Sequence, residues 1–440
     1  MEFISSLVQG HELMLASLIL IVAYIFIATE KISKVSVALV GAALTLFLGL
    51  LAQDKTDGLE GVHYFINYVD FNVIFLLVSM MIIVHIASKC GLFSWIANEL
   101  LKMTKGKPMA VLFTLAIFTA ITSAFLDNVT TVILILPITF VVAQKLDINP
   151  VPLLITEIIA SNIGGTATLI GDPPNIIIGS KAGFSFMDFV NELTLIVSLI
   201  LIVVIGILAI CFRKQLVTTK EKMNAISEID NSQTITDKAL AIRSGLVLLL
   251  VILGFVTHDI THFQTYLVAM AGAAFLLLFE KPEGILKDVE WNTIFFFIGL
   301  FIIIGGLEAA GGIELMAKWV LDVTNGSQSA ASMLIVWCSG ILSGIIDNIP
   351  YTATMAPLIH QIQLVEGVDY AYPLWWCLSL GACLGGNMTI IGAAANVVVS
   401  EVSAANGHKI SFMYYLKYGV LATFISLIMA SVFVWIKYLN

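Results

Sequence analysis

A set of polar, glycine and proline residues occurs twice in this sequence, in two strongly apolar halves. The pair Asp127-Asn128 is repeated as Asp347-Asn348, 220 residues later, and the pair Gly164-Gly165 as Gly385-Gly386, 221 residues later. Hydrophobic segments that are interrupted at matching places in two halves are typical of the binding site of a secondary transporter. The duplication therefore predicts two structural copies whose breaks meet.

The composition predicts an integral membrane protein. The chain has 440 residues, of which 59% are hydrophobic and 12% are charged, against about 25% charged in a typical globular chain. The apolar run Leu13–Ala28 precedes the first basic residue, Lys31. Because a secretory signal carries its positive charges ahead of the apolar run, we interpret this run as a spanning helix. Nothing in the composition indicates a nucleic-acid partner.

The one long polar stretch, residues 213–243, predicts a linker between a first repeat, 1–212, and a second repeat, 244–440. Each half has four uninterrupted spans, which we expect at 13–29, 35–52, 70–88 and 192–212, and again at 244–257, 265–279, 291–307 and 412–436. The fifth span of each half is glycine-rich and broken, at 151–180 and 373–400.

A further apolar segment in each half, 108–143 and 332–358, is cut in its middle by the Asp-Asn pair. We interpret each as a re-entrant hairpin that turns at this pair, since irregular backbone at membrane depth must be buried in protein or line a wet cavity. The predicted fold is therefore an all-α polytopic membrane protein of two repeats, each with five spans, one of them broken, plus a re-entrant hairpin.

An odd number of crossings per half inverts the second copy in the membrane. With the N-terminus on one side, 17 of the 21 lysine and arginine residues fall on the other side, and only Lys55, Lys181, Lys318 and Lys437 remain. Basic loops mark the cytoplasmic side. We therefore expect a multi-pass protein of the plasma (inner) membrane, with a cytoplasmic linker and both termini outside.

Asp127 and Asp347 lie in the middle of apolar segments, where an acidic residue costs about 2.5–3.5 kcal/mol on insertion scales. One interpretation is that they bind a cation or a proton. The other is that each caps a hairpin helix through exposed backbone amides, with Asn128 and Asn348 completing the turn. The two roles are compatible, because a helix N-terminus inside a membrane also orders an ion site.

The broken spans add polar groups beside these aspartates. Glycines there let backbone groups point at a small ligand, and the side chains are Thr166, Thr168 and Asn175 in the first copy and Asn387, Thr389 and Asn396 in the second. Asp172 is an acid without a counterpart, and Glu157 is a candidate proton relay. No lysine or arginine falls in the cut segments, so we expect no fixed positive partner there, which favours a cation, a proton or a neutral solute.

Four strings carry a family resemblance: SAFLDNVTTVILILPI, ASNIGGTATLIGDPPNIIIGS, SGIIDNIPYTATMAPLI and LGACLGGNMTIIGAAANVVVS. They resemble the ion transporter superfamily, in its branch of arsenite/antimonite permeases, D-type sodium/proton antiporters and the melanosomal P protein, which is related to divalent anion/sodium symporters. The resemblance implies inverted repeats, an elevator mechanism and a homodimer.

The resemblance also implies site residues, by position in the four strings. They are Ser123, Asp127, Asn128, Asn162, Gly165, Thr166, Thr168, Asp172 and Asn175 in the first copy, and Ser343, Asp347, Asn348, Asn387, Thr389 and Asn396 in the second. Of these, Asp127, Asn128, Asp347 and Asn348 are the positions at which we expect Na⁺. No cofactor is expected beyond Na⁺ or H⁺ as the coupling ion.

The leading hypothesis is a secondary transporter of a small inorganic ion, by Na⁺/H⁺ antiport or by arsenite/antimonite efflux. A dicarboxylate or citrate transporter is an alternative, although that branch has Ser-Asn-Thr at its hairpin tips where this chain has Leu-Asp-Asn-Val and Ile-Asp-Asn-Ile. A passive anion channel is another. An intramembrane aspartyl protease is disfavoured, because Gly344-Ile345-Ile346 precedes Asp347 in place of Gly-x-Gly, and we expect no enzyme.

Overall fold

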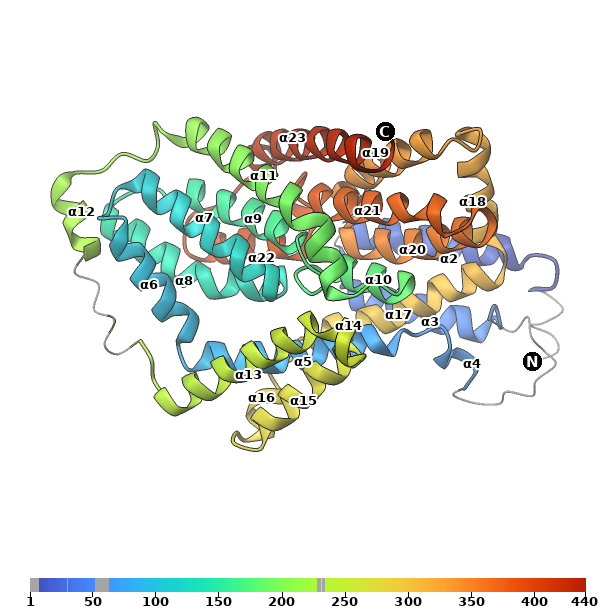
Figure 1. Cartoon of the computed structure of the whole chain (residues 1–440), viewed down its shortest axis with the longest axis horizontal. Coiled ribbons are helices and arrows are strands. Elements are labelled where there is room, and N and C mark those ends of the chain that lie inside the picture. The colour runs from blue at the N-terminus through green and yellow to red at the C-terminus, as the bar shows by residue number, and fades with distance from the viewer. Residues whose placement is uncertain (1–7, 30, 52–62, 228–230, 232–233) are drawn as a thin grey trace.

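The computed structural model describes residues 8–29, 31–51, 63–227, 231 and 234–440, and these residues contain helices and turns but no strand. Lys55, residue 52 of the expected second span and five residues of the expected linker lie outside the described residues. Figure 1 shows an elongated molecule whose helices run mostly along or obliquely to its long axis.

The first half contains ten helices in the described residues. They are α2 (Glu12–Thr29), α3 (Lys34–Phe47), α4 (His63–Ile66), α5 (Phe71–Lys89), α6 (Leu92–Met103), α7 (Pro108–Phe125), α8 (Asn128–Leu146), α9 (Val151–Gly165), α10 (Pro173–Ala182) and α11 (Phe186–Phe212).

After the linker helix α12 (Lys220–Ser227), the described part of the second half follows the same order. Its elements are α13 (Lys238–Val256), α14 (His258–Thr261), α15 (Thr265–Leu277), α16 (Pro282–Leu286), α17 (Trp291–Ala309), α18 (Gly312–Val323), α19 (Gln328–Ile346), α20 (Asn348–Glu366), α21 (Val368–Gly385), the 3₁₀ turn η1 (Ile390–Gly392), α22 (Ala394–Ala405) and α23 (Phe412–Tyr438).

Four pairs of equivalent helices in the two halves have equal lengths. Helices α5 and α17 have 19 residues each, α6 and α18 have 12, α8 and α20 have 19, and α11 and α23 have 27. In Figure 1 the hairpin helices α7 and α8 lie in the left half of the view and α20 lies in the right half.

Four helix starts precede the sequence prediction by four residues or more, and two of these are α19, which begins at Gln328 in place of 332, and α21, which begins at Val368 in place of 373. Helix α11 begins at Phe186, six residues before the expected 192, because Ser185 and Asp188 form a reciprocal capping box. Helix α13 begins at Lys238, inside the expected linker, because the Asp237 carboxylate accepts the Leu240 amide at 3.0 Å. A cap satisfies amides that the first turn leaves unpaired, so both polar residues start their helices earlier than apolar periodicity suggests.

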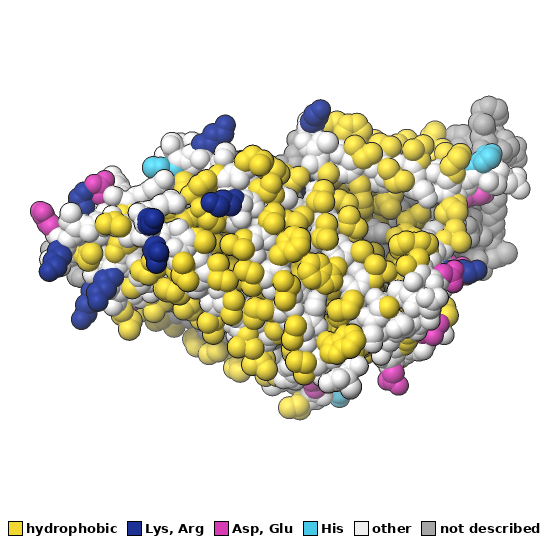
Figure 2. Space-filling model, turned by 90° about the horizontal axis from the view of Figure 1, so that it is seen from above, with side chains coloured by type: hydrophobic (Ala, Val, Ile, Leu, Met, Phe, Trp, Pro, Cys, Tyr) yellow, Lys and Arg dark blue, Asp and Glu magenta, His cyan; other side chains and the backbone are white. Residues whose placement is uncertain are grey.

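The outer surface is that of a membrane protein. Nine helices in the described residues are long and apolar enough to cross a bilayer. Figure 2 shows a face covered by hydrophobic side chains, with the charged side chains mostly toward its edges. Large apolar side chains such as Ile202 and Leu250 are more than 60% exposed, which only a hydrocarbon environment makes favourable.

Helices α3 and α17 pack closely, at glycines. An added Cβ on Gly299 would lie 2.7 Å from the Ala38 backbone, and one on Gly306 would lie 2.6 Å from the Thr45 side chain. The residue numbers in these contacts increase along both helices, from Ala38 and Gly299 to Thr45 and Gly306, so α3 and α17 run in the same direction. Their N-termini, with Lys34 on α3 and Glu290 at the N-cap of α17, therefore lie at the same end of the pair.

Candidate functional site

The first hairpin turns at Leu126 and Asp127, between α7 and α8. The Asp127 carboxylate caps α8, because it accepts the backbone amide of Thr130 at 2.9 Å and the hydroxyl of the same residue at 2.5 Å. The capping role is therefore present here. The next residue, Asn128, points its side chain elsewhere, toward Asn162 and Asp172.

The second hairpin turns at Asp347, between α19 and α20. Asp347 accepts the Ile349 amide at 3.1 Å, but its backbone differs from that of Asp127. Its φ of 105° lies in a region that suits glycine and costs a side-chain-bearing residue about 1–3 kcal/mol. Strain of this kind persists where the surrounding contacts hold a residue in place, and it is confined to one of the two tips.

The two broken spans have the predicted unwound centres. Helix α9 ends at Gly165 and α10 begins at Pro173, while α21 ends at Gly385 and α22 begins at Ala394. One asparagine in each copy binds the loop carbonyls. The Asn175 amide donates to the Thr166 and Thr168 carbonyls at 3.1 and 2.9 Å.

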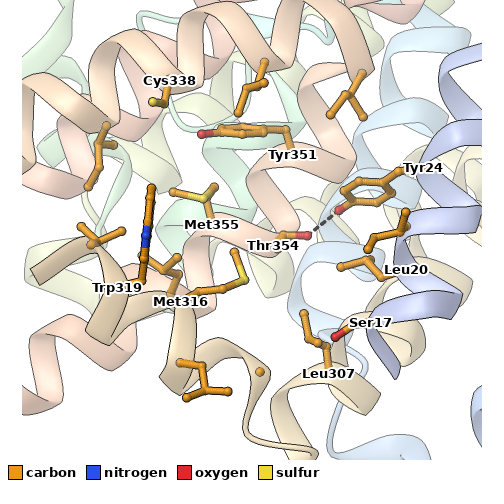
Figure 3. Close-up of a pocket in the computed structure, with 18 of the residues that line it drawn as sticks. Ser17, Leu20, Tyr24, Leu307, Met316, Trp319, Cys338, Tyr351, Thr354 and Met355 are labelled. Atoms are coloured by element: carbon orange, nitrogen blue, oxygen red, sulfur yellow. Dashed lines mark hydrogen bonds between the residues drawn. The ribbon is translucent and has the colours of Figure 1, made fainter. Parts of the chain in front are cut away.

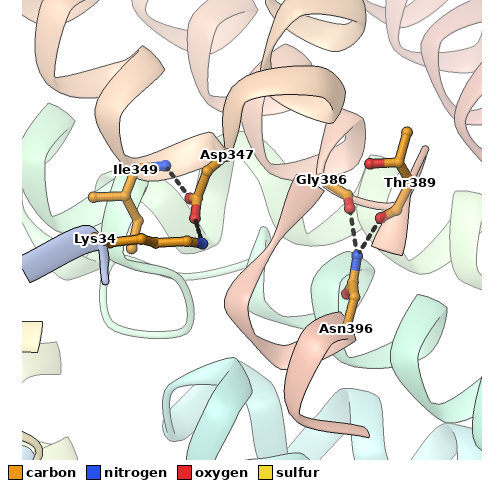
Figure 4. A network of polar contacts seen from close by, with 6 residues as sticks. All are labelled: Lys34, Asp347, Ile349, Gly386, Thr389 and Asn396. Atoms are coloured by element: carbon orange, nitrogen blue, oxygen red, sulfur yellow. Dashed lines mark hydrogen bonds and ion pairs between the residues drawn. The ribbon is translucent and has the colours of Figure 1, made fainter. Parts of the chain in front are cut away.

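The second copy repeats this arrangement. The Asn396 amide donates to the carbonyls of Gly386 and Thr389 at 2.7 and 2.9 Å (Figure 4). Each loop is also tied to its hairpin, since Thr389 donates to the Gly344 carbonyl at 2.6 Å and Thr168 donates to the Ala124 carbonyl. Thr168, Asn175, Thr389 and Asn396 therefore shape the loops.

The two hairpin tips meet at Asp172, which is fully buried. The Asn128 amide donates to it at 3.4 Å from the first tip, and the Asn348 amide donates to both its oxygens at 3.2 Å from the second. The charges of Asp127 and Asp347 also act on Asp172. Residues far apart in the sequence thus form one polar cluster.

Asn162 links the two broken loops. Its amide donates to Asn387 at 3.0 Å and to Asn396 at 2.9 Å, and its carbonyl oxygen accepts from Asn128 at 3.3 Å. The Asn387 side chain is fully buried, and its own Nδ2 has no hydrogen-bond partner among the described residues. Since a buried polar group without a partner is costly, this amide is a candidate contact for a ligand.

The remaining predicted side chains support the backbone. Ser123 accepts from Ser161 at 3.1 Å, Ser343 donates to the Ala382 carbonyl at 2.8 Å, and Thr166 donates to the Asn162 carbonyl at 2.8 Å. At Gly165, an added Cβ would lie 2.5 Å from the Gly171 carbonyl oxygen, so glycine lets the loop fold onto the helix end.

Glu157 lies apart from this cluster in its hydrogen bonding. It is 3% exposed, and Thr139 of α8 donates to its carboxyl group at 2.6 Å. No contact with Asp172 or with either tip residue is present in the structure's described part. Its role as a proton relay stays a prediction.

The expectation that the site has no fixed positive partner is wrong. The Lys34 ammonium lies 2.6 Å from the Asp347 carboxylate, as Figure 4 shows, and comes from the start of α3. The Asp347 side chain is 2% exposed and that of Lys34 is 25% exposed. Sequence reasoning placed Lys34 in a basic loop, because the residue lies outside every cut segment.

The sequence analysis did not predict three further side chains of the cluster. Ser161 donates to the Asn128 carbonyl at 3.3 Å, and Ser379 and Cys383 donate to the Asn175 side-chain oxygen at 2.6 and 3.5 Å. Cys383 stands 221 residues after Asn162, so the repeat offset could have singled it out. In the described residues no group of three or more His, Cys, Asp or Glu is placed to hold a metal ion.

A large cavity lies to one side of the second hairpin and is apolar. It has a volume of about 650 Å³ and is lined by residues such as Leu20, Met316 and Trp319. Figure 3 shows the Tyr24 hydroxyl pointing to Thr354 of α20 at its edge, and the same hydroxyl donates to the Pro350 carbonyl at 2.5 Å. With no charged side chain in its lining, this cavity is unsuited to an ion.

A second cavity, of about 540 Å³, is polar and follows the other side of α20. Its lining includes Asp70, Lys181, Glu308 and His360, together with Ala353 and Ala356 of the hairpin. Lys181 and Glu308 form an ion pair at 3.8 Å. The polar cavity thus lies between α5, α10, α17 and the hairpin helix α20.

Apolar helices, two hairpins and two broken spans around a buried polar cluster define a polytopic helical membrane protein, and a solved structure has a similar fold. The crystal structure of the YdaH transporter of Alcanivorax borkumensis matches with a TM-score of 0.56 at 15% identity, covering 89% of this chain and 88% of that chain. At this identity the similarity concerns the fold alone.

The chain belongs to the citrate transporter family, CitMHS, whose model matches residues 24–381. A 46 kDa membrane protein of Mycobacterium leprae is 40% identical over 97% of this chain and 99% of its own length, and an uncharacterized transporter of Mycobacterium tuberculosis is 39% identical over 96% of this chain and 97% of its own length. The mouse P protein is 31% identical over 93% of this chain and 58% of its own length. The expected relationship to the P protein is confirmed, and the chain is a membrane transporter rather than an enzyme.

Proposed function

We propose that this protein is a secondary active transporter of a small inorganic ion, coupled to H⁺ or Na⁺. One observation carries the proposal: Asn128 and Asn348, from two hairpin tips, both donate to the buried carboxylate of Asp172. Broken helices and freed backbone groups at the meeting point of two repeats coordinate substrate and ion in transporters. The unpaired amide of Asn387 adds a donor in the same cluster.

The charges of the cluster favour a cation or a proton as the coupling ion. Asp127, Asp172 and Asp347 interact electrostatically, and Lys34 balances one of them. Two acids then remain for a cation, which amide and carbonyl oxygens would help to coordinate. Na⁺/H⁺ antiport and arsenite or antimonite efflux, the activities of the D-type and permease branches, are the two substrate versions of this proposal.

Helix packing supports inverted repeats. The Tyr68 ring, just before α5, covers Gly305 near the end of α17, and Asp288, just before α17, pairs with His85 near the end of α5 at 3.1 Å. These equivalent helices therefore run in opposite directions. An elevator motion of the hairpin-bearing helices, as a homodimer in the plasma membrane, is part of the proposal, with the polar cavity along α20 as the access route.

The experiment is ion transport by the purified protein in liposomes, followed with an internal pH dye and by solid-supported-membrane electrophysiology with a panel of ions. We expect Na⁺ to drive proton movement. In Asp172→Asn and Asp127→Asn the rate should fall by about tenfold or more, the factor that 1.4 kcal/mol of binding free energy produces. Asp322→Asn, an exposed acid on α18, is the matched control.

Two results contradict the proposal. One is that no ion of the panel gives a signal, and the other is that Asp172→Asn keeps the wild-type rate. Counterflow of the substrate would in addition exclude a passive channel, because an open pore does not couple influx of one ion to efflux of another.

A citrate-type anion is the second candidate, favoured by the family match and by Lys34. An anion would take the place of the Asp347 carboxylate beside Lys34 and would accept from asparagine amides of the cluster such as Asn387. Uptake of labelled citrate with and without Na⁺ separates the two candidates, since only the anion version predicts saturable citrate uptake that Lys34→Met abolishes.

A further inference from the structure

Asp127 and Asp347 hold equivalent places in the two halves but have different neighbours. Asp127 accepts hydrogen bonds from Thr130 of its own helix, and the charged groups from outside its hairpin that interact with it, Glu290 and Asp172, are both acids. Asp347 instead contacts a lysine ammonium at 2.6 Å. Both halves therefore have the acid, but the charged neighbours of the two acids have opposite signs.

The difference comes from one helix pair. Helices α3 and α17 run in the same direction, with Gly41 against Ile303 between the contacts described above, so Lys34 and Glu290 lie at the same end. From this end Lys34 reaches the second hairpin tip, and Glu290 acts on the first. One pair of helices thus presents opposite charges to the two tips.

The ion pair governs what Asp347 can bind. A buried carboxylate needs a cation, a proton or strong donors. The Ile349 amide satisfies one oxygen of Asp347 and Lys34 satisfies the other. While Lys34 is in place, Asp347 has little capacity left for Na⁺ or H⁺. Asp127 and Asp172 have only neutral donors in the described structure, so their charges remain available.

We propose that Lys34 is a built-in counter-ion that withholds Asp347 from cation binding and leaves the coupling cation to Asp127 and Asp172. Lys34 is in this sense a specificity-determining residue, since it sets the number of cations that the site accepts. The inference rests on the proposed function and deepens it by giving Lys34 a role in setting the coupling.

Among the described residues, titratable groups from three places interact with Asp347. They are Lys34 from α3, Tyr24 from α2 and Asp172 from the first broken loop. Of these three, Lys34 alone can carry positive charge. Its replacement therefore leaves Asp347 beside a second acid, and Asp347 should then take up a proton or a cation of its own.

The first test measures coupling in liposomes for Lys34→Met, Lys34→Arg and the double variant Lys34→Met/Asp347→Asn. We expect Lys34→Met to transport one more cation or proton per cycle. The reversal potential of transport should therefore shift, and the transport rate should show a new inhibition at acidic pH. Lys34→Arg and the double variant should keep wild-type coupling. Lys318→Met, at an exposed lysine of α18, is the matched control.

Asp347→Asn alone provides the converse test. It removes the carboxylate that lies 2.6 Å from the Lys34 ammonium. Cation transport should therefore fall by about tenfold or more and should recover in the double variant, since breaking one side of a buried ion pair is worse than replacing both partners by neutral groups. If Lys34→Met keeps wild-type coupling and pH profile, or if the double variant is no better than Asp347→Asn, the proposal is wrong.

A second measurement does not depend on transport. Infrared difference spectra of the purified protein on acidification should show an added protonated-carboxyl band in Lys34→Met that is absent from the wild type and from the double variant. If the wild type moves no ion but this band appears, the proposed function fails and the role of Lys34 stands. If the wild type transports and the band is missing, only the role of Lys34 fails.

Discussion

Asn175 and Asn396 are the residues that fix the shape of the broken spans. Each is fully buried and uses one side-chain amide to satisfy carbonyls of a loop that no helix satisfies. Their side-chain oxygens face the opposite copy, since Asn396 accepts from Asn162 and Asn175 from Ser379. One residue type thus holds its own loop and attaches it to the other half.

Replacing this amide should loosen the protein as a whole. In Asn396→Ala the carbonyls of Gly386 and Thr389 lose their donor, and a buried polar group without a partner costs about 1–3 kcal/mol. We expect a lower midpoint of thermal unfolding in detergent. Asn406→Ala, at an exposed asparagine that bonds to Val402 of its own helix, should change the midpoint little, and equal losses in both variants would contradict the assignment.

Single residues also mark the limit of sequence reasoning. The sequence predicts Asp127, Asp172 and Asn348 as site residues because polar groups in apolar segments are costly and stand out. Lys34 does not stand out, because a lysine between two spans is ordinary. Its partner Asp347 is 313 residues away, and a contact at this separation depends on how α3 packs in the folded chain.

At the level of elements, the hairpins are held by glycines that allow close helix contact. An added Cβ on Gly164 of α9 would lie 2.2 Å from the Ala120 carbonyl oxygen of α7, and one on Gly385 of α21 would lie 2.4 Å from the Gly340 carbonyl oxygen of α19. Small residues let backbones approach in membrane proteins. Each broken span is therefore packed directly onto the first helix of its hairpin.

A methyl group at this contact should separate the two helices. Gly164→Ala meets backbone atoms, which cannot swing away as a side chain can, so the overpacking should cost about 1–3 kcal/mol or more. Gly206→Ala is the control, because nothing lies within 4 Å of its Cβ in α11. We expect a lower unfolding midpoint and lost transport for Gly164→Ala only; a Gly164→Ala protein as stable as Gly206→Ala would contradict the packing.

Element boundaries were predictable to different degrees. The hairpin turns and the unwound centres follow from Asp, Gly and Pro, which interrupt helices for local reasons. The starts of α11, α13, α19 and α21 were missed, although Ser185, Asp188 and Asp237 are present in the sequence as capping residues of the first two. Apolar periodicity identifies the buried length of a helix, whereas its polar first turn is identified by the cap.

At the level of the whole molecule, inverted repeats predict where the polar ends lie. If the copies are inverted, the linker with α12 and the C-terminus after α23 lie on opposite sides of the membrane, with the linker on the basic, cytoplasmic side. A green fluorescent protein inserted after residue 225 should be fluorescent. Alkaline phosphatase fused after Asn440 should be active, because this enzyme is active only outside the cytoplasm. A fluorescent insertion together with an inactive phosphatase would place both positions on the cytoplasmic side and exclude the inversion.

The apolar helices differ widely in length. Helices α11 and α23 have 27 residues each, about 40 Å at 1.5 Å per residue, while α3 has 14 residues and α15 has 13, about 20 Å. The hydrocarbon core of a bilayer is about 30 Å thick. A bilayer crossed by both kinds of helix would be thinner beside the short ones, while the long ones tilt or draw it thicker. Lipids of different chain length would gather at different flanks, and the work of bending the bilayer would enter the energetics of every transport cycle.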